Sequence, residues 1–535
     1  MKKAIVLFLT VTMLFLTACN SVQPSPDNGT DAGNGGGNVN IDGHTHVDII
    51  GNGLCSVCGK PMSLTVDIYT VNDMHGKLFD TDDNIGADEL TAYLEMCKKN
   101  NENTVILSSG DMWQGTSESN LTRGNIMTEW LNSIGCAAMT LGNHEFDWGE
   151  AAIRENLAIA EFPFLAINIY NKASGTLADY CTPSAVVDLG AVEIGIIGAI
   201  GDCYSSIASD KVTEVEFKVG DELTELVKEE SERLRGNGVD VIIYSLHDGN
   251  GKSTSTTTDI SANAMSSYYD IELSEGYVDV VFEGHSHQRY VYRDRYGVYH
   301  LQGGGDNSGI THASFTYNAE SGDVSFDTAE SIRSSKYSSL TGSDIISALA
   351  SKYASEISKG NEYLGRLTKY MSSDDICALA AKLYAEAGER FFTDYSIVLG
   401  GGYLSARSPY DLSAGDVYYK NIYGILPFDN DIVLCSVKGR DLLSKFINTN
   451  NSNYYISYTG YGNSIKNSID QNATYYIVTD TYTAYYAPNR LTVVASYTPG
   501  IYARDLIADH FKATLTTASA AEIIMFFTEE ERYAA

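Results

Sequence analysis

The feature that most constrains this chain is a series of short apolar runs, each followed at once by polar residues. Runs rich in Val, Ile, Leu and Ala occupy residues 64–71, 104–109, 137–141, 239–246 and 278–282. Helical patterns separate several of them, as at residues 87–99 and 220–235. Strands that alternate with helices predict an α/β fold with a well-buried sheet.

The polar residues after these runs carry carboxylate, amide and imidazole groups. They are Asp73, His75, Asp111, Asn143, His247, His285 and His287. Because the carboxyl ends of neighbouring strands in an open α/β sheet meet at one edge, we expect these side chains to converge there. The spacing of Asp73 and His75, and of His285 and His287, would turn both members of each pair to one side of an extended segment.

These side chains together form a donor set for two metal ions, provided that one carboxylate bridges the ions. The mixture of nitrogen and oxygen donors favours zinc, manganese, iron or cobalt over calcium. The sequence therefore predicts two divalent metal ions as cofactors.

The charge of the chain excludes one class of partner. With 36 Lys and Arg against 69 Asp and Glu, the net charge is −33, so a broad basic face for a nucleic-acid polymer is not expected. An anionic substrate would need local positive charge, which metal ions supply. No protein partner is predicted.

The length of 535 residues exceeds what one hydrophobic core supports, so we expect two domains.

The N-terminal residues predict an export signal and a lipid anchor. Lys2 and Lys3 precede an apolar run at residues 4–16, which is too short to span a membrane. Residues 1–18 are therefore interpreted as a signal peptide, and the small residues before Cys19 resemble a bacterial lipobox. Residues 19–42 form a Gly- and Asn-rich flexible linker in this interpretation. The predicted location is extracytoplasmic, lipid-anchored to the cell membrane.

The next segment, residues 43–62, combines two histidines with two cysteines. His44 and His46 precede Cys55 and Cys58, a set that can hold one tetrahedral zinc. A disulfide between the two cysteines fits the same spacing, and the sequence leaves both alternatives open.

Five blocks in order resemble a known family. They are Asp73-x-His75, Gly110-Asp111, Gly142-Asn143-His144-Glu145, His247 and Gly284-His285-x-His287. The blocks resemble the calcineurin-like metallophosphoesterases and, more closely, the bacterial 5′-nucleotidase / 2′,3′-cyclic phosphodiesterase family, over residues 64–500. The resemblance implies a catalytic β-sandwich flanked by helices at 63–335, a linker helix within 336–365, patterned at 344–357, and a smaller C-terminal α/β substrate-binding domain at 366–525.

The resemblance also implies roles for the site residues. The first metal site would be formed by Asp73, His75, Asp111 and His287. The second would be formed by Asp111, Asn143, His247 and His285. His144 resembles the family's catalytic histidine, and Asp147 resembles the carboxylate that orients it.

The second domain carries weaker signals for substrate binding. Three glycines at 400–402 follow a strand predicted at 395–399 and would allow close approach of a ligand. By resemblance, Phe428 would stack on a base, Asn430 would contact it, and Tyr482 would be the second stacking aromatic, with Tyr485 or Tyr486 as alternates.

The chain departs from the family at a substrate-contacting arginine. Leu404 stands where the family has Arg, and Arg407, three residues on, is the predicted replacement.

Three functions fit the sequence. The leading one is an extracellular metal-dependent phosphohydrolase of nucleotides, which activates water with two metals. The second is an enzyme for another ester: a 2′,3′-cyclic nucleotide, a nucleotide-sugar or a non-nucleotide phosphomonoester. The third is a nucleotide-binding surface lipoprotein without turnover.

Overall fold

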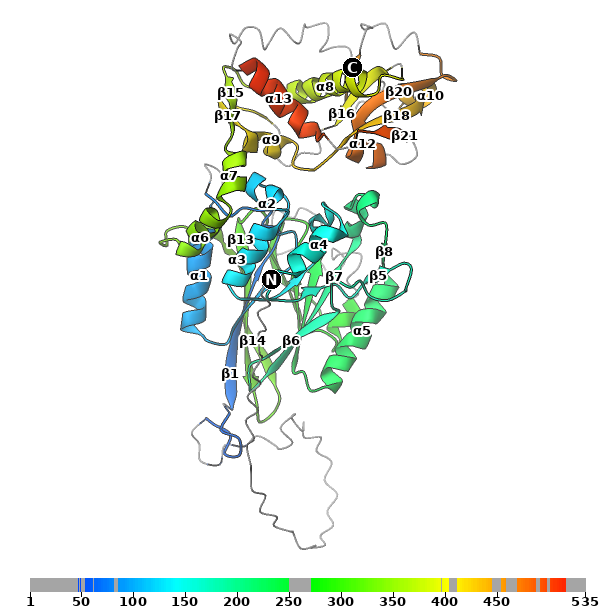
Figure 1. The fold of residues 1–535 in the computed structure, drawn as a ribbon. Helices are drawn as coiled ribbons and strands as arrows, with labels where there is room; N and C mark the ends of the chain where they lie inside the picture. Colours follow the sequence, from blue (N-terminus) through cyan, green and yellow to red (C-terminus); the bar gives the residue numbers. More distant parts are fainter. Residues whose placement is uncertain are drawn as a thin grey trace, which may run out of the picture.

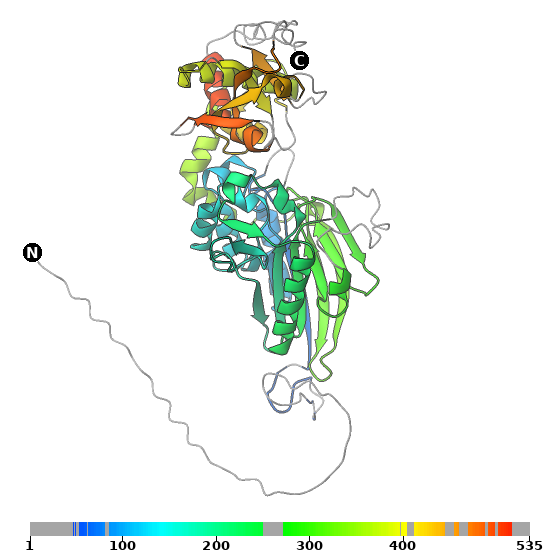
Figure 2. The same cartoon turned by 90° about the vertical axis from the view of Figure 1, so that its right-hand side faces the viewer.

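The computed structural model describes residues 47, 49, 53–60, 62–80, 85–249, 271–395, 397–403, 411–444, 454–458, 469–486, 491–497 and 501–515. The predicted signal peptide, Cys19 and linker therefore lie outside the described residues. Figure 1 shows a smaller part of the chain stacked over one end of a larger one, and Figure 2 shows the same stacking from the side.

In the described residues, the larger part contains two six-stranded sheets. The first has the order β14 (Val324–Arg333), β13 (Gly309–Asn318), β1 (Ser63–Val71), β2 (Thr104–Ser108), β3 (Cys136–Thr140) and β4 (Phe164–Leu165). The second has the order β11 (Arg289–Arg293), β12 (Tyr299–Gly303), β10 (Val280–Glu283), β9 (Val241–His247), β7 (Glu193–Ile200) and β6 (Ser184–Asp188). All the strands predicted in this region form. β1, β2 and β3 are mutually parallel, as are β9 and β10, so their carboxyl ends point the same way.

Side chains along these strands alternate between two apolar layers. Ile68 and Ile243 belong to the core between the sheets, whereas their neighbours Tyr69 and Tyr244 belong to the outer layers. Strand residues with both faces buried explain the near-continuous apolar runs of the sequence.

Helices cover both outer faces of the sandwich. Helices α1 (Ala87–Asn100), α3 (Asn125–Ser133) and α4 (Glu150–Leu157) pack on the first sheet, and α5 (Asp221–Gly236) packs on the second. The short helix α2 (Ser117–Leu121) and the strand pair β5 (Ile169–Asn171) and β8 (Val215–Phe217) complete this part. The predicted β-sandwich flanked by helices is confirmed.

The smaller part is an α/β domain, as predicted. Its sheet has the order β19 (Tyr454–Tyr458), β16 (Ile397–Tyr403), β20 (Thr474–Asp480), β18 (Ile432–Lys438) and β21 (Thr492–Ser496). The main helices packing with it are α8 (Ser373–Phe391), α9 (Tyr419–Ile425) and α13 (Ala503–Leu515), with α10 (Gly439–Leu442), α12 (Thr481–Tyr486) and the strand pair β15 (Tyr363–Leu367) and β17 (Gly415–Tyr418) beside them. The boundaries proposed for the individual domains stay predictions.

Two local predictions were wrong. The helix expected at 344–357 is interrupted, forming α6 (Asp344–Lys352) and α7 (Ala354–Gly360). Tyr353 leaves the helical conformation between them, and its hydroxyl donates to Glu129 Oε1 of α3 at 2.8 Å. The glycines at 400–402 lie inside β16 rather than after a strand, because β16 is hydrogen-bonded to β19 on one side and β20 on the other. Pairing on both edges outweighs the weak strand preference of glycine.

Within the described ranges, no helix has both the length and the apolar character needed to traverse a lipid bilayer.

Candidate metal centre and active site

The predicted ligands converge where the two sheets end. The loops after β1, β2 and β3 deliver Asp73, His75, Asp111 and Asn143, while the end of β9 and the loop after β10 deliver His247, His285 and His287. The sequence indicated one sheet edge for all of them. The structure instead forms the site between the edges of two sheets, because the sandwich sets these edges face to face.

The first group of donors consists of Asp73, His75 and His287. His75 Nε2 lies 3.0 Å from His287 Nε2 and 4.0 Å from Asp73 Oδ1. His287 Nε2 lies 3.5 Å from the same Asp73 oxygen. Asp73 and His75 are buried, whereas the His287 side chain is 35% exposed and lines a cavity. One cation could reach all three donor atoms.

Asp111 lies between this group and a second one. Its Oδ2 is 3.9 Å from His75 Nε2 and 3.3 Å from His247 Nε2. Asn143 Oδ1 in turn lies 3.3 Å from His247 Nε2 and 3.0 Å from His285 Nδ1. This central position is the one that a carboxylate shared by two metal ions must occupy.

Backbone carbonyls set the orientation of two imidazoles. His75 Nδ1 is held by the carbonyl of Gln114 at 2.8 Å, and His247 Nδ1 by the carbonyl of Ser109. A carbonyl only accepts, so Nδ1 carries a proton in each ring, and Nε2, which faces the donor cluster, is the nitrogen that can bind a cation. This arrangement is typical of metal-ligating histidines.

Buried side chains without an assigned role in the sequence interpretation anchor the carboxylates. Asn72 donates to Asp73 Oδ2 at 2.6 Å, and the His285 N–H donates to the same carboxylate. Glu145, fully buried, accepts the backbone N–H of Asp111 at 2.9 Å. It lies inside the Gly-Asn-His-Glu block, so its place in that motif was the available signal.

Gln302, which the sequence analysis also did not identify, fixes the loop at 284–288 that carries both histidines of the last motif. Its Nε2 donates to the Gly284 carbonyl at 2.9 Å. Its Oε1 accepts from the Ser286 hydroxyl at 2.8 Å and from the Gln288 N–H at 2.9 Å. Gln302 is buried on β12, and no local pattern marks it.

The backbone at the ligands is not extended, which corrects the i, i+2 argument. Asp73, His75, Asp111, His285 and His287 have φ values of 49°, 50°, 56°, 70° and 55°. Such left-handed conformations are disfavoured for residues with a Cβ and cluster at functional sites. The pairs still meet, because tight turns rather than a pleated strand present their side chains.

Burial and mutual charge shift the titration of the cluster strongly. Burial raises the pKa of Asp73. Burial acts in the same direction on Asp111, but His247 and other imidazoles outweigh it and hold the Asp111 pKa well below its usual range. Burial disfavours the charged form of His247, yet Asp111 and Asp73 raise its pKa to about 10. Burial, with His247 nearby, lowers the pKa of His285 to about 4. Shifts of this kind, in which buried carboxylates and imidazoles depend on one another's charge, fit a site that binds a cation.

His144 and Asp147 form the predicted pair beside the donors. The His144 Nδ1–H donates to Asp147 Oδ2 at 2.8 Å, and the two side chains are equally exposed, at 18%. The His144 backbone N–H also donates to Asp111 Oδ1 at 2.9 Å, which ties the pair to the donor cluster. The Asp147 carboxylate thus orients the His144 ring through Nδ1, and Nε2 takes no part in this bond.

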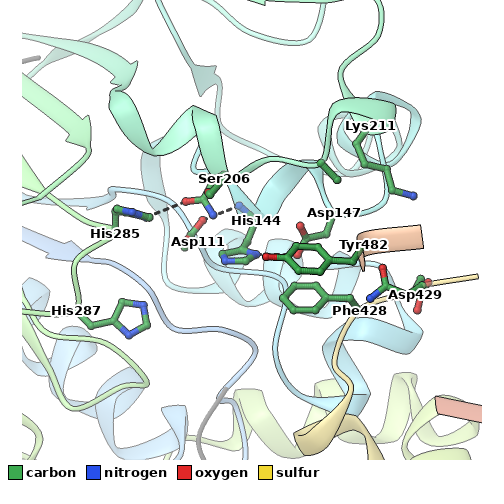
Figure 3. Close-up of a pocket in the computed structure, with 13 residues that line it drawn as sticks. Asp111, His144, Asp147, Ser206, Lys211, His285, His287, Phe428, Asp429 and Tyr482 are labelled. Carbon is green, nitrogen blue, oxygen red and sulfur yellow. Dashed lines mark hydrogen bonds and ion pairs between the residues drawn. The ribbon is translucent and has the colours of Figure 1, made fainter. Parts of the chain in front are cut away.

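One cavity of about 390 Å³ joins these groups to the second domain (Figure 3). It is lined by Asp111, Asn143, His144, Asp147, Ser206, Ala208, Lys211, His285, His287, Phe428, Asp429, Asn430 and Tyr482. The larger part contributes four of the predicted ligands (Asp111, Asn143, His285 and His287), the pair His144 and Asp147, and Ser206, Ala208 and Lys211.

The second domain contributes two aromatic rings to this cavity. Phe428 and Tyr482 lie nearly parallel, with an interplanar angle of 9° and ring centroids 6.4 Å apart. The Phe428 ring also stacks on His144 at 5.9 Å. Asn430 lines the cavity beside them. Of the three tyrosines weighed from the sequence, Tyr482 lies in the cavity lining.

Other substrate-side residues were missed or cannot be placed. Lys211, the last residue of a short 3-10 helix (Ser209–Lys211), is a cation in the cavity lining, and no motif marks it. Arg504, buried on α13, donates to the Phe428 carbonyl at 2.8 Å and forms an ion pair with Asp429. Arg407 lies outside the described residues.

The N-terminal cysteine pair precedes β1, at the opposite end of that strand from Asp73. His44 and His46 are outside the described residues, Cys55 is buried and Cys58 is exposed. The choice between zinc and a disulfide stays a prediction.

Comparisons with known proteins agree with the motifs. Residues 66–289 match the family model of the calcineurin-like phosphoesterases. Protein UshA of Yersinia enterocolitica is 26% identical over 437 residues, which cover 72% of this chain and 76% of UshA. An apyrase of Tabanus yao is 30% identical over 235 residues, which cover 42% of this chain and 39% of the apyrase.

A solved structure shares the two-domain fold. The 5′-nucleotidase precursor of Thermus thermophilus aligns with a TM-score of 0.62 at 19% identity, over 84% of this chain and 96% of the other. This likeness concerns the fold alone. The resemblance of the motifs to the calcineurin-like phosphoesterases is thus confirmed: residues 66–289 of the chain carry this domain, a domain of phosphoric ester hydrolases.

Proposed function

We propose that this protein is an extracytoplasmic, metal-dependent phosphohydrolase that acts on nucleotides in the manner of a 5′-nucleotidase. The observation that carries the proposal is the single cavity in which metal donors, a His–Asp pair and two parallel aromatic rings meet. Such a cavity suits a molecule with a phosphate at one end and a flat ring at the other.

Two divalent ions, among zinc, manganese, iron and cobalt, fit the donor set. Asp73, His75, Asp111 and His287 would hold one, and Asp111, Asn143, His247 and His285 the other. The distances around Asp111 and the inward-facing imidazole nitrogens support this assignment. Ions bound there would supply Lewis-acid activation of a water nucleophile and neutralise charge on the phosphoryl oxygens.

His144 would act on the leaving side of the reaction. Asp147 holds its Nδ1–H, so Nε2 is the atom that can exchange a proton with the substrate. A protonated ring would stabilise negative charge that develops on the ester oxygen and could deliver the proton to it. The shared cavity puts His144 beside the proposed ligands.

The second domain would bind the nucleoside. A base stacking on Phe428 and Tyr482 would gain aromatic contact on its faces, and the Asn430 amide could donate to or accept from its edge. Arg407 is proposed to replace the family arginine that is Leu404 in this chain.

We also propose that Cys19 carries a lipid anchor after removal of residues 1–18. Labelled fatty acid should appear on the wild-type protein, and Cys19→Ala should release the protein without changing its turnover. Absence of the label from the wild-type protein would refute the anchor.

The test of function is metal-dependent phosphate release from a panel of esters. AMP, 2′,3′-cyclic nucleotides, UDP-sugars and sugar phosphates should be compared, with and without chelator. The proposal predicts the highest kcat/KM with a nucleoside monophosphate. A higher value for a cyclic nucleotide, a nucleotide-sugar or a sugar phosphate would favour the other ester hydrolases, and binding without any turnover would favour a non-catalytic surface protein.

A further inference from the structure

We propose that Asn120 is a positioning residue that fastens the base-binding loop of the second domain to the metal-binding loop of the first. The inference rests on the proposed nucleotide hydrolysis and deepens it. It assigns to a side chain outside every sequence motif the task of holding the two ends of the site in register.

The contacts of Asn120 join the two domains directly. Its Nδ2 donates to the Pro427 carbonyl of the second domain at 2.6 Å. Its Oδ1 accepts the Gly115 N–H of the first domain at 2.8 Å. The residue is 3% exposed, so water does not replace either bond readily.

On the metal side, Asn120 reaches a loop that cannot shift independently of a ligand. Gly115 follows Gln114, whose carbonyl holds His75 Nδ1 at 2.8 Å. A Cβ at Gly115 would lie 2.2 Å from the His75 carbonyl oxygen, so the two backbones are in close contact. The Thr116 N–H donates to the same oxygen at 3.2 Å. A fixed point at Gly115 is therefore a fixed point for His75.

On the nucleoside side, Asn120 holds the residue immediately before Phe428. Arg504 fixes the next carbonyl, that of Phe428, from within the second domain. The loop is thus held by its own domain through Arg504 and by the other domain through Asn120. Loss of the Asn120 donor would remove this hydrogen bond to the first domain and leave the one from Arg504.

The surroundings of Asn120 form an inter-domain contact. Leu121, next in the chain, packs against the core of the second domain. Ser117, at the start of α2, lies against Gly360 of α7. Figure 1 shows α2 at the top of the larger part, next to α7 and below the second domain. Helix α2 therefore lies at the domain boundary, where a relative motion of the domains would change its contacts.

The position of Phe428 gives the contact its chemical consequence. Its ring stacks on His144 at 5.9 Å, across the domain boundary. A nucleotide must place its phosphate at the donors and its base at Phe428 together, so its turnover depends on this spacing. A small phosphate ester without a base uses the first domain only.

The test uses Asn120→Asp in the full-length protein. The carboxylate can still accept from Gly115 but cannot donate to Pro427. We expect kcat/KM for AMP to fall about 10-fold, the scale of one unpaired buried acceptor, mostly through KM. Turnover of a small chromogenic phosphate ester and the metal content should stay within about 2-fold. Asn132→Asp is the matched control, because Asn132 makes the same two kinds of bond, to Ile159 and Glu161, within the first domain.

Two further measurements separate positioning from general damage. If Asn120 acts through Phe428, adding Asn120→Asp to Phe428→Ala should lower AMP turnover little further. Hydrogen–deuterium exchange of residues 421–431 should rise in Asn120→Asp and not in Asn132→Asp, a readout that needs no activity. Should Asn120→Asp not fold, Asn120→Ala serves in the exchange measurement, where loss of the Pro427 bond should again raise exchange at residues 421–431.

Equal slowing of AMP and the small ester, multiplicative effects with Phe428→Ala, or unchanged exchange at 421–431 would each overturn the proposal. If the wild-type protein does not hydrolyse nucleotides, the proposed function fails by itself, and the exchange comparison still decides the role of Asn120.

Discussion

Replacing Phe428 by Ala should separate base binding from chemistry. Phe428 lies parallel to Tyr482, with ring centroids 6.4 Å apart, and it contacts the donor side of the cavity through His144. Stacking of a base on an aromatic ring contributes ~1–3 kcal/mol. The expected loss in kcat/KM for AMP is therefore about 5- to 150-fold, because each ~1.4 kcal/mol is tenfold.

The loss should appear mainly in KM. Stacking is present in both the bound substrate and the transition state, so its removal weakens both alike. Steady-state kinetics with AMP and with a small chromogenic phosphate ester measure the two effects side by side. Phe428→Leu keeps apolar volume without the ring face and is the packing control. His144→Ala should instead lower kcat for both substrates.

An equal decrease of kcat/KM for AMP and for the small ester in Phe428→Ala would refute the reasoning. Phe428 would then be a packing residue that supports His144, and the second domain would have to recognise something other than a base.

Three further predictions concern the donor cluster and the stability of the second domain. Asp111→Asn should lose metal and activity together, since Asp111 lies within 3.9 Å of His75 and 3.3 Å of His247; elemental analysis that finds two metals per chain in this variant would disprove its bridging role. Gln302→Leu should lower metal affinity by about 10- to 100-fold in a chelator competition assay, because the loop that carries His285 and His287 would lose the hydrogen bonds that hold it; wild-type affinity in this variant would show that these bonds do not position the ligands. Burial raises the pKa of Asp480 to about 6 from its usual 3.8. Between these values the folded chain keeps a proton that the unfolded chain has lost, so this contribution to stability is complete below pH 4 and is lost, by about 3 kcal/mol, as pH rises through 6. The difference between wild-type and Asp480→Asn unfolding free energies, measured from pH 4 to 7, should show this slope, and a pH-independent difference would contradict it.

The buried strands and the donors could be predicted from the sequence because both depend on local patterns, whereas the sandwich was implied by the family resemblance. Residues 64–71 and 239–246 are apolar on both faces, which only a doubly covered sheet explains. From the sequence, the polar residues at the ends of these strands were expected at one edge of that sheet. The pairing of strands into two sheets is a long-range property, so the meeting of Asp73 with His287 across the sandwich followed from the family resemblance rather than from any local pattern.

The failures have physical causes of the same kind. Asp73 and His75 adopt left-handed turns that no spacing rule predicts, because the surrounding loops impose them. Gln302 looks like an ordinary strand residue until the loop at 284–288 is folded over it. Asn120 lies in a short helix, and its partner at Pro427 is 307 positions away in the chain. Sequence patterns register neighbours along the chain, whereas these roles depend on neighbours in space.

The most direct test of the account is phosphate release from AMP as a function of bound metal. Protein stripped with chelator and reloaded with zinc, manganese, iron or cobalt should be assayed while elemental analysis reports ions per chain. The account predicts no turnover without metal and turnover that rises with occupancy to a maximum at two ions per chain. Full turnover by the metal-free protein, or none at any occupancy, would contradict it.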